Sequence, residues 1–185
     1  MTLDYLGLDR NVAILDGHWS GWKAKGLPQS GMPEEVEPSA FVPRLRPEII
    51  VSLQAMQDLS WLARQPGSTI ALLDARASEE YGGRVPGKGV TRGGHIPGAA
   101  NLCWRLTLEA GDPPKLRSEN ELRALFEAAG ARPGRTVVTY CRTGVQASHL
   151  YVVAKALGYP AKLYDGSYVE WSQEKTPIQD SWVMK

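Results

Sequence analysis

The alternation of short apolar runs with helical segments is the feature of this sequence that most restricts its fold. Three short runs, rich in aliphatic and β-branched residues, occupy residues 69–73, 136–140 and 161–164. Segments with helical spacing of their apolar residues occupy residues 52–64, 118–129 and 146–157. Short buried strands that alternate with helices are typical of a parallel sheet covered on both faces. The sequence therefore predicts an α/β fold of three layers, with about five parallel strands flanked by helices.

Helix boundaries are also marked in the sequence. Ser52 and Ser118 are good residues to begin a helix, and Glu121 stands three residues after Ser118, which is the spacing of a capping box. Gly130 and Gly158 follow the last apolar residues of two helical segments, where a helix commonly ends. These signals support the proposed division into helices and strands.

Composition and charge exclude several classes of protein. The formal net charge is +1, so bulk electrostatics give no reason to expect a nucleic-acid partner. No run approaches the roughly 18 to 20 apolar residues that cross a membrane, and the first residues lack the pattern of a secretory signal. We therefore expect a cytoplasmic protein that does not contact a membrane. Its two cysteines, Cys103 and Cys141, are predicted to be free thiols rather than a single disulfide.

An internal repeat suggests how the chain is divided. Residues 15–28 match residues 164–177, with an Asp-Gly pair, a Trp five residues after the Gly and a later Pro in both copies. The offset is about one domain length, which favours two homologous domains in tandem. The alternative is that an Asp-Gly turn before an aromatic helix arose twice by chance.

The residues after the first copy have the composition of a linker. Residues 29–47 are rich in Pro and acidic residues and show no periodicity. We therefore predict a remnant of a first domain at residues 1–28, a linker at residues 29–47 and a catalytic domain at residues 48–185. The remnant would then have a possible pairing partner in a missing N-terminal half.

The segment that contains Cys141 carries the clearest chemistry. A predicted strand ends at Tyr140 and a predicted helix begins near Gln146, so Cys141 faces the unpaired N–H groups at the start of that helix. Those donors and the helix dipole favour the thiolate, which is the reactive nucleophile. Gly144 permits the sharp turn, and Arg142 adds positive charge. The alternative is a cysteine that only packs as a small apolar residue at the end of a strand.

Four motifs in this chain resemble those of the rhodaneses, the thiosulfate sulfurtransferases. They are Leu-Asp-Ala-Arg at residues 73–76 with Glu-Glu-Tyr at 79–81, Gly-His-Ile-Pro-Gly-Ala-Ala-Asn at 94–101, Cys-Arg-Thr-Gly-Val-Gln-Ala at 141–147, and Tyr-Asp-Gly at 164–166 with Glu-Trp at 170–171. They occur in the family's order, and the resemblance covers residues 46 to about 177. Residues 5–45 resemble the end of the inactive first domain and the interdomain linker of tandem rhodaneses.

The resemblance implies a mechanism and a set of site residues. The Cys141 thiolate would take the outer sulfur of thiosulfate, a small anionic donor, and pass it as a persulfide to cyanide or a thiol. No cofactor or metal is implied. The residues that would bind the substrate and the persulfide are Arg142, Thr143, Gly144, Val145, Gln146, Ala147 and Arg92.

Two departures from the family pattern concern charge near the nucleophile. Many tandem rhodaneses have Lys where this chain has Thr143, and many have a substrate-contacting Arg where it has Glu80. Either Arg84 or Arg92 could replace that charge. Within the family, an Arg directly after the nucleophile suggests thiosulfate, so Arg142 favours thiosulfate over 3-mercaptopyruvate.

The remaining polar residues are predicted to support the site rather than to react. Asp74 and Arg76 form either a salt-bridged pair at the edge of the active site or a pair that only stabilises a loop. His95 is predicted to be a buried, hydrogen-bonded residue, and His149 a residue of the helix surface. Cys103 is expected to pack on the core side of a short strand after Asn101. The scattered His and Cys residues do not form a metal-ligand set.

Other functions compatible with this fold place different demands on the loop after the cysteine. A phosphatase on the same fold needs an Arg six residues after the Cys, where this chain has Ala147. The open alternatives are a 3-mercaptopyruvate sulfurtransferase and a non-catalytic module for sulfur relay or protein interaction.

Overall fold

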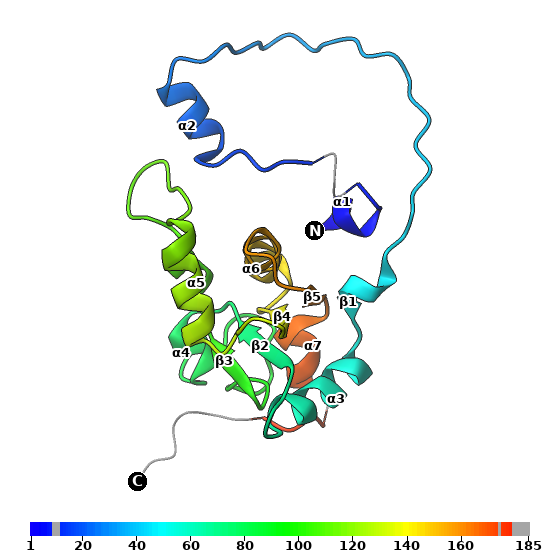
Figure 1. The fold of residues 1–185 in the computed structure, drawn as a ribbon, viewed down its shortest axis with the longest axis vertical. Coiled ribbons are helices and arrows are strands. Elements are labelled where there is room, and N and C mark those ends of the chain that lie inside the picture. The colour runs from blue at the N-terminus through cyan, green and yellow to red at the C-terminus, as the bar shows by residue number, and fades with distance from the viewer. Residues whose placement is uncertain (9–11, 174, 179–185) are drawn as a thin grey trace.

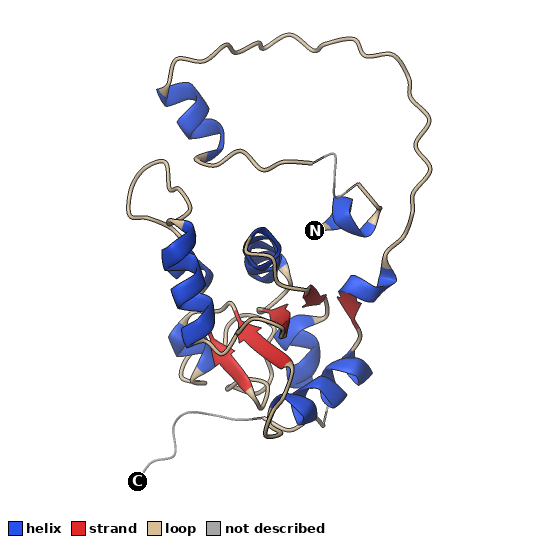
Figure 2. Ribbon diagram, in the orientation of Figure 1, coloured by secondary structure: helices blue, strands red, loops and turns tan. Residues whose placement is uncertain are grey.

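A five-stranded parallel sheet forms the centre of the protein. The computed structural model describes residues 1–8, 12–173 and 175–178. The sheet has the order β1-β5-β4-β2-β3, and every pair of neighbouring strands is parallel (Figures 1 and 2). Its strands are β1 (Ile50–Val51), β2 (Ile70–Asp74), β3 (Ala99–Asn101), β4 (Thr136–Tyr140) and β5 (Ala161–Tyr164). The predicted α/β fold is confirmed.

Helices cover both faces of this sheet. The described helices are α1 (Thr2–Tyr5), α2 (His18–Ala24), α3 (Leu53–Ala63), α4 (Ser78–Tyr81), α5 (Glu119–Ala128), α6 (Val145–Ala156) and α7 (Ser167–Gln173), with short 3-10 turns η2 (Pro47–Ile49) and η3 (Trp104–Thr107). Helix α3 begins at the predicted cap Ser52. The predicted capping box of Ser118 and Glu121 is present at the start of α5.

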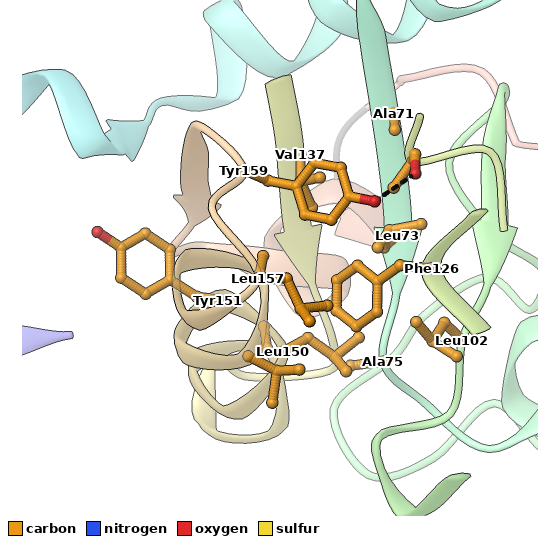
Figure 3. Close-up of a cluster of buried hydrophobic side chains, with 14 of the residues drawn as sticks. Ala71, Leu73, Ala75, Leu102, Phe126, Val137, Leu150, Tyr151, Leu157 and Tyr159 are labelled. Carbon is orange, nitrogen blue, oxygen red and sulfur yellow. Dashed lines mark hydrogen bonds between the residues drawn. The ribbon is translucent and has the colours of Figure 1, made fainter. Parts of the chain in front are cut away.

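Side chains alternate between the two faces along each strand, as the geometry of a strand requires. In β2, Leu73 contributes to the core beneath α5 and α6, whereas Leu72 contributes to the core beneath α3 and α7. Figure 3 shows the first of these cores, where Phe126 of α5 and Leu150 of α6 meet Leu73. Because both faces are covered, the central strands β2 and β4 are largely apolar, which is why they appear as short apolar runs in the sequence.

The carboxyl ends of the central strands lie at one edge of the sheet. Asp74, the last residue of β2, is in register with Tyr140, the last residue of β4. Asp74 is also in register with Asn101, the last residue of β3. Ligands of open parallel sheets bind beyond this edge, so the loops after β2, β3 and β4 are where a site is expected.

Residues 1–8 dock on the α/β unit through helix α1. The Asp4 carboxylate is paired with Lys155 of α6 at 2.5 Å and with Arg46 at 2.6 Å, and it accepts a hydrogen bond from the Tyr151 hydroxyl at 2.6 Å. Met1 and Tyr5 pack against the core beneath α6. The following segment, which includes α2, contacts the loop before α5, where Asp16 accepts a hydrogen bond from the Leu116 amide at 3.0 Å.

The two copies of the sequence repeat adopt the same local structure. His18 and Ser167, which follow the two Asp-Gly pairs, have positive φ angles of 56° and 53°. In each copy the Trp indole donates a 2.8 Å hydrogen bond to a Pro carbonyl six residues later, from Trp22 to Pro28 and from Trp171 to Pro177. The likeness is local, and the division into a remnant, a linker and a catalytic domain stays a prediction.

The environments of the two copies differ. Tyr164 and Tyr168 of the second copy are fully buried, whereas the matching residues Leu15 and Trp19 of the first are 51% and 54% exposed. Residues 29–45 contain no helix or strand and follow an extended path between α2 and η2 (Figure 1). The apolar residues of the first copy therefore have no core of their own in the described chain.

The predicted environments of Cys103 and His149 were wrong. Cys103 lies after β3 rather than in a strand, and it caps the 3-10 turn η3 while remaining partly exposed. His149 is half-buried, and its Nε2 atom lies 2.7 Å from the Thr107 hydroxyl oxygen. Burial, together with the charge of His18, lowers the pKa of His149. The irregular segment that contains η3 packs over α6, and the helical pattern of α6 does not reveal this contact.

Candidate active site

Cys141 lies between strand β4 and helix α6, at the carboxyl edge of the sheet. Tyr140 ends the strand and Gly144 caps the helix in a left-handed conformation, with φ of 93°. This turn brings the Gly144 amide within 3.1 Å of the Cys141 sulfur, to which it donates a hydrogen bond. An N–H group and the amino end of a twelve-residue helix both stabilise negative charge at this position. The geometry is that of a cradle for a thiolate or a persulfide anion.

The first turn of helix α7 holds the backbone of this loop. The Tyr168 amide donates to the Cys141 carbonyl at 2.9 Å, and the Val169 amide donates to the Arg142 carbonyl at 3.1 Å. The Ser167 hydroxyl accepts a hydrogen bond from the Cys141 amide at 3.4 Å and donates to the Tyr164 carbonyl at 3.0 Å. Sequence reasoning assigned no role to Ser167. The sequence signal that could have indicated a role for Ser167 is its position directly after the Asp165-Gly166 turn.

Asp74 and Arg76 form a buried ion pair beside the loop. The Arg76 side chain donates to both oxygens of Asp74, and its Nη2 atom lies 2.6 Å from Asp74 Oδ2. Nη2 also donates to the Gly94 carbonyl, and the guanidinium lies 3.9 Å from the centre of the Tyr168 ring. Burial alone lowers the pKa of Arg76, but the charge and hydrogen bonds of Asp74 outweigh it and raise that pKa.

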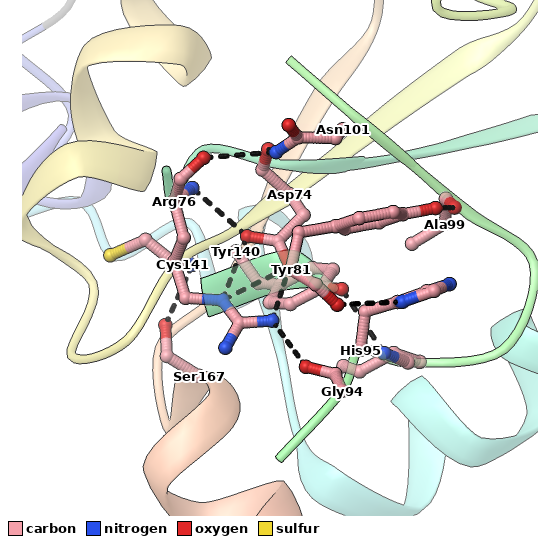
Figure 4. Close-up of polar contacts among 11 residues, drawn as sticks. Asp74, Arg76, Tyr81, Gly94, His95, Ala99, Asn101, Tyr140, Cys141 and Ser167 are labelled. Carbon is pink, nitrogen blue, oxygen red and sulfur yellow. Dashed lines mark hydrogen bonds and ion pairs between the residues drawn. The ribbon is translucent and has the colours of Figure 1, made fainter. Parts of the chain in front are cut away.

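This ion pair supports the site without facing the nucleophile. Figure 4 shows the Cys141 sulfur pointing away from Asp74 and Arg76. The Asn101 amide nitrogen donates to the main-chain carbonyls of Asp74 and Arg76, and the Ala75 amide donates to the Tyr140 carbonyl. Of the two predicted roles for the pair, the geometry favours a structural one.

His95 is buried and hydrogen-bonded, as the sequence predicted. Its Nδ1 atom lies 2.9 Å from the Tyr81 carbonyl oxygen, and its ring stacks on the Tyr81 ring with centroids 3.6 Å apart (Figure 4). The neighbouring Ile96 amide donates to the Tyr140 hydroxyl, and burial raises the pKa of Tyr140 well above its usual value. His95 therefore helps to fix the loop before β3, and it is not placed as a base for Cys141.

The other loop residues differ in exposure. Thr143 and Val145 are exposed, and Val145 retains 75% of its surface. Ala147 is fully buried, and its carbonyl accepts a hydrogen bond from Thr139. Gln146 is half-buried, and its Oε1 atom is enclosed without a hydrogen-bond donor. The backbone of the loop thus surrounds the sulfur, whereas the Thr143 and Val145 side chains form its outer rim.

Arg142 lies under the glycine-rich loop that follows α4. A Cβ atom at Gly87 would lie 3.1 Å from Arg142 Cδ and 3.4 Å from its Nη1, so only a glycine fits here without displacing the side chain. Within the described ranges, the Arg142 side chain forms no hydrogen bond or ion pair. Its guanidinium is therefore available to a ligand beside Cys141.

Arg92 has a different position from the one that the resemblance implied. Its guanidinium donates to the carbonyls of Ser172, Trp171 and Thr176, at 2.8 to 3.2 Å, and to the Thr176 hydroxyl at 3.1 Å. These groups lie at the carboxyl end of α7, whereas the amino end of α7 holds Cys141. Arg92 closes the end of this helix and ties the glycine-rich loop to it, so we do not retain it as a substrate-binding residue.

The described residues contain neither a membrane-spanning helix nor a cluster of metal ligands. None of the helices has the length and apolar composition needed to cross a membrane. No three His, Cys, Asp or Glu side chains gather as a metal site in the part of the chain that is described. Both cysteines are free thiols, as predicted.

Comparison with known proteins identifies the family. Residues 58–174 match the Rhodanese-like domain, so the chain belongs to the family of rhodanese-like domains. It is 31% identical to a putative thiosulfate sulfurtransferase of Synechococcus elongatus and 33% identical to the sulfur carrier protein TtuD of Thermus thermophilus. It is also 34% identical to a probable 3-mercaptopyruvate sulfurtransferase of Pseudomonas aeruginosa.

These matches cover most of this chain but only part of the relatives. The three alignments include 92%, 88% and 91% of this chain and 53%, 59% and 57% of the relatives, in the same order. Among solved structures, that of YnjE superposes with a TM-score of 0.81 at 26% identity, covering 97% of this chain and 45% of YnjE. The chain therefore spans about half the length of the proteins that it resembles.

Proposed function

We propose that this chain is a sulfurtransferase that moves the outer sulfur of thiosulfate to a thiophilic acceptor through a persulfide on Cys141. The observation that carries the proposal is the position of the Cys141 sulfur, 3.1 Å from the Gly144 amide at the amino end of α6. The names of the related proteins support the same chemistry, since they include thiosulfate and 3-mercaptopyruvate sulfurtransferases.

The reaction has two displacements at sulfur. The Cys141 thiolate attacks the outer sulfur of thiosulfate, the sulfur–sulfur bond of thiosulfate breaks, and sulfite leaves with the bonding electron pair. The resulting Cys141 persulfide anion lies at the helix terminus, where backbone N–H groups stabilise its charge. Cyanide or a thiolate then attacks the outer sulfur, and the electron pair of the persulfide bond returns to Cys141.

Intact mass after thiosulfate treatment tests the first displacement. The protein should gain the mass of one sulfur atom, and an equal amount of sulfite should appear. Cys141→Ser should abolish both, because a hydroxyl is a far weaker nucleophile than a thiolate at neutral pH. Cys103→Ser is the matched control and should still form the adduct. Persistence of the adduct in Cys141→Ser would refute the assignment.

The names of two relatives suggest two alternative functions, a 3-mercaptopyruvate sulfurtransferase and a sulfur carrier, and the same purified protein can test both. A 3-mercaptopyruvate sulfurtransferase would show a higher kcat/KM for that donor than for thiosulfate. A sulfur carrier, as TtuD is named, would form the persulfide but would convert little cyanide to thiocyanate. The exposed Thr143, which brings no second charge to the loop, is the observation in favour of a donor less anionic than thiosulfate.

A further inference from the structure

The Glu80 carboxylate lies next to Arg142 beside the Cys141 loop. A Cβ atom placed on Gly87 would be 2.6 Å from Glu80 Oε1 and 3.4 Å from Arg142 Nη1. The two charged groups therefore approach the same glycine of the loop after α4. Within the described residues the two groups do not form an ion pair, because no nitrogen of Arg142 lies within 4.0 Å of a Glu80 carboxylate oxygen. A guanidinium and a carboxylate thus lie close to each other without neutralising each other by contact.

Glu80 also lacks hydrogen-bond donors. Its Oε1 atom is enclosed and unpartnered, and its Oε2 atom is neither enclosed nor hydrogen-bonded among the described residues. Glu79, the preceding residue on α4, instead faces solvent, and its carboxylate accepts a hydrogen bond from the Ser78 hydroxyl. An acceptor without a donor in a partly buried position is unfavourable, so Glu80 is set up to bind a donor supplied by a ligand.

The pair of charges selects for the charge pattern of that ligand. A dianion such as thiosulfate is attracted by Arg142 but repelled by Glu80. A ligand with only a positive charge is attracted by Glu80 but repelled by Arg142. A zwitterion that carries an ammonium and a carboxylate on the same carbon atom satisfies both, because its charged groups are separated by about the length of one hydrogen bond.

We propose that Glu80 and Arg142 recognise an α-amino acid thiol as the sulfur acceptor, with Glu80 binding its ammonium and Arg142 its carboxylate. The inference rests on the proposed function. The acceptor thiolate attacks the outer sulfur of the Cys141 persulfide, the persulfide bond breaks, and Cys141 leaves as a thiolate. The product is the persulfide of the amino acid. Neither an oxidant nor a reductant is needed, because the sulfur is transferred at an unchanged oxidation state.

Sulfur transfer to four acceptors tests this specificity. The protein is loaded with thiosulfate, freed of excess donor, and mixed with L-cysteine, cysteamine, N-acetyl-L-cysteine or 3-mercaptopropionate, and loss of the Cys141 persulfide is followed by mass. Glu80→Gln should lower kcat/KM about tenfold for L-cysteine and cysteamine, which carry an ammonium group. The same substitution should change the other two acceptors by less than about twofold.

Each acceptor is compared between variant and wild type, so the intrinsic reactivity of each thiol cancels. Glu79→Gln removes the same charge from the same helix without touching Gly87, and it should leave all four rates unchanged. An equal loss for all four acceptors with Glu80→Gln, or no loss for any, would overturn the proposal.

A binding measurement separates this inference from the proposed function. S-methyl-L-cysteine, which cannot accept sulfur, should slow alkylation of Cys141 by iodoacetamide in wild type and should do so much less in Glu80→Gln. This readout requires no persulfide. Protection that depends on Glu80 would support the inference even if thiosulfate failed to load Cys141. Absence of protection in wild type would refute it even if loading succeeded.

Discussion

At the scale of single residues, different groups of the Cys141 loop hold the sulfur and select the substrate. The backbone of the loop and the amide of Gly144 surround the sulfur, and these groups carry no information about which donor approaches. The side chains of Arg142 and Glu80 lie outside that cradle and carry charge. Substitution of these two residues should therefore alter selectivity more than it alters the chemistry at Cys141.

Arg142→Ala is expected to weaken the use of thiosulfate. A charge-assisted hydrogen bond to the sulfonate end contributes on the order of 1.5 to 3 kcal/mol, so kcat/KM for thiosulfate should fall by roughly one to two powers of ten. The loss for 3-mercaptopyruvate should be smaller, because its carboxylate lies at a different distance from the transferred sulfur. Steady-state kinetics with both donors measure the difference.

Ionic strength provides a second measure of the same contact. Arg142 is only half-buried, so added salt should screen its attraction for thiosulfate and raise KM. In Arg142→Ala this salt dependence should largely disappear. An equal loss for both donors in the variant would instead mean that Arg142 tunes Cys141 rather than binding the donor.

Removal of one partner of the Asp74–Arg76 pair should destabilise the fold. Both side chains are fully buried, so Asp74→Ala leaves an uncompensated charge in the core, at a cost of about 3 to 5 kcal/mol in the free energy of unfolding. Urea unfolding measures this loss. Glu119→Ala is the matched control, because its ion pair with Arg123 is exposed and should contribute no more than about 1 kcal/mol. A similar small change in both variants would contradict the structural role of the pair.

At the scale of elements, two helix termini meet at Cys141. The amino end of α6 provides the N–H group that contacts the sulfur, and the amino end of α7 binds the carbonyls of Cys141 and Arg142. Helix α6 is also the surface on which α1 docks, through Asp4. The same helix therefore joins the Cys141 loop to residues 1–8.

The docking of α1 should depend on pH through Asp4. Burial raises the pKa of this carboxyl group, but hydrogen bonds from Lys155 and Tyr151 and the charges of Lys155 and Arg46 outweigh burial, so its pKa is lowered. A carboxyl group with a lowered pKa in the folded state stabilises that state above its ordinary value of 3.8, and this contribution is lost as the pH falls through the lowered value. We therefore expect docking to persist at neutral pH and to weaken below about pH 4.

Hydrogen exchange measures this docking. The Arg44 and Arg46 amides donate to the carbonyls of Leu6 and Tyr5, so their protection reports on the position of α1. Asp4→Asn should speed their exchange at neutral pH, whereas Asp58→Asn on the exposed side of α3 should not. Unchanged protection in Asp4→Asn would show that apolar contacts alone hold α1.

At the scale of the whole molecule, the contacts that position Cys141 come from residues 74–169, and within the described residues 1–8 and 12–45 none is found. Deletion of residues 1–45 should therefore leave thiosulfate loading of Cys141 intact, as judged by intact mass. The thermal midpoint should fall, because Met1 and Tyr5 no longer cover the core and Lys155 loses Asp4. Loss of loading in a variant that remains folded would place part of the site in the N-terminal segment.

The sequence by itself determined the class of fold and the position of Cys141 between a strand and a helix, because both depend on local patterns. The runs at 136–140 and 161–164 match β4 and β5, and the predicted run at 69–73 is shifted by one residue from β2. Strands β1 and β3 were not recognised individually, since two or three residues carry no periodicity. Cys141, Gly144 and the start of α6 lie within a few consecutive residues, where spacing alone defines the geometry.

Only the tertiary structure decided which charges lie near Cys141. Arg92 closes the end of α7, whereas Glu80 lies beside Arg142, although the three residues belong to two neighbouring loops and a short helix. Ser167 reaches the Cys141 amide from a residue 26 positions later. The direction of a side chain on an irregular loop depends on contacts between distant segments, and no local pattern of residues encodes it. The residues of the cradle around Cys141 could therefore be predicted from the sequence, whereas the charged side chains that surround it could not.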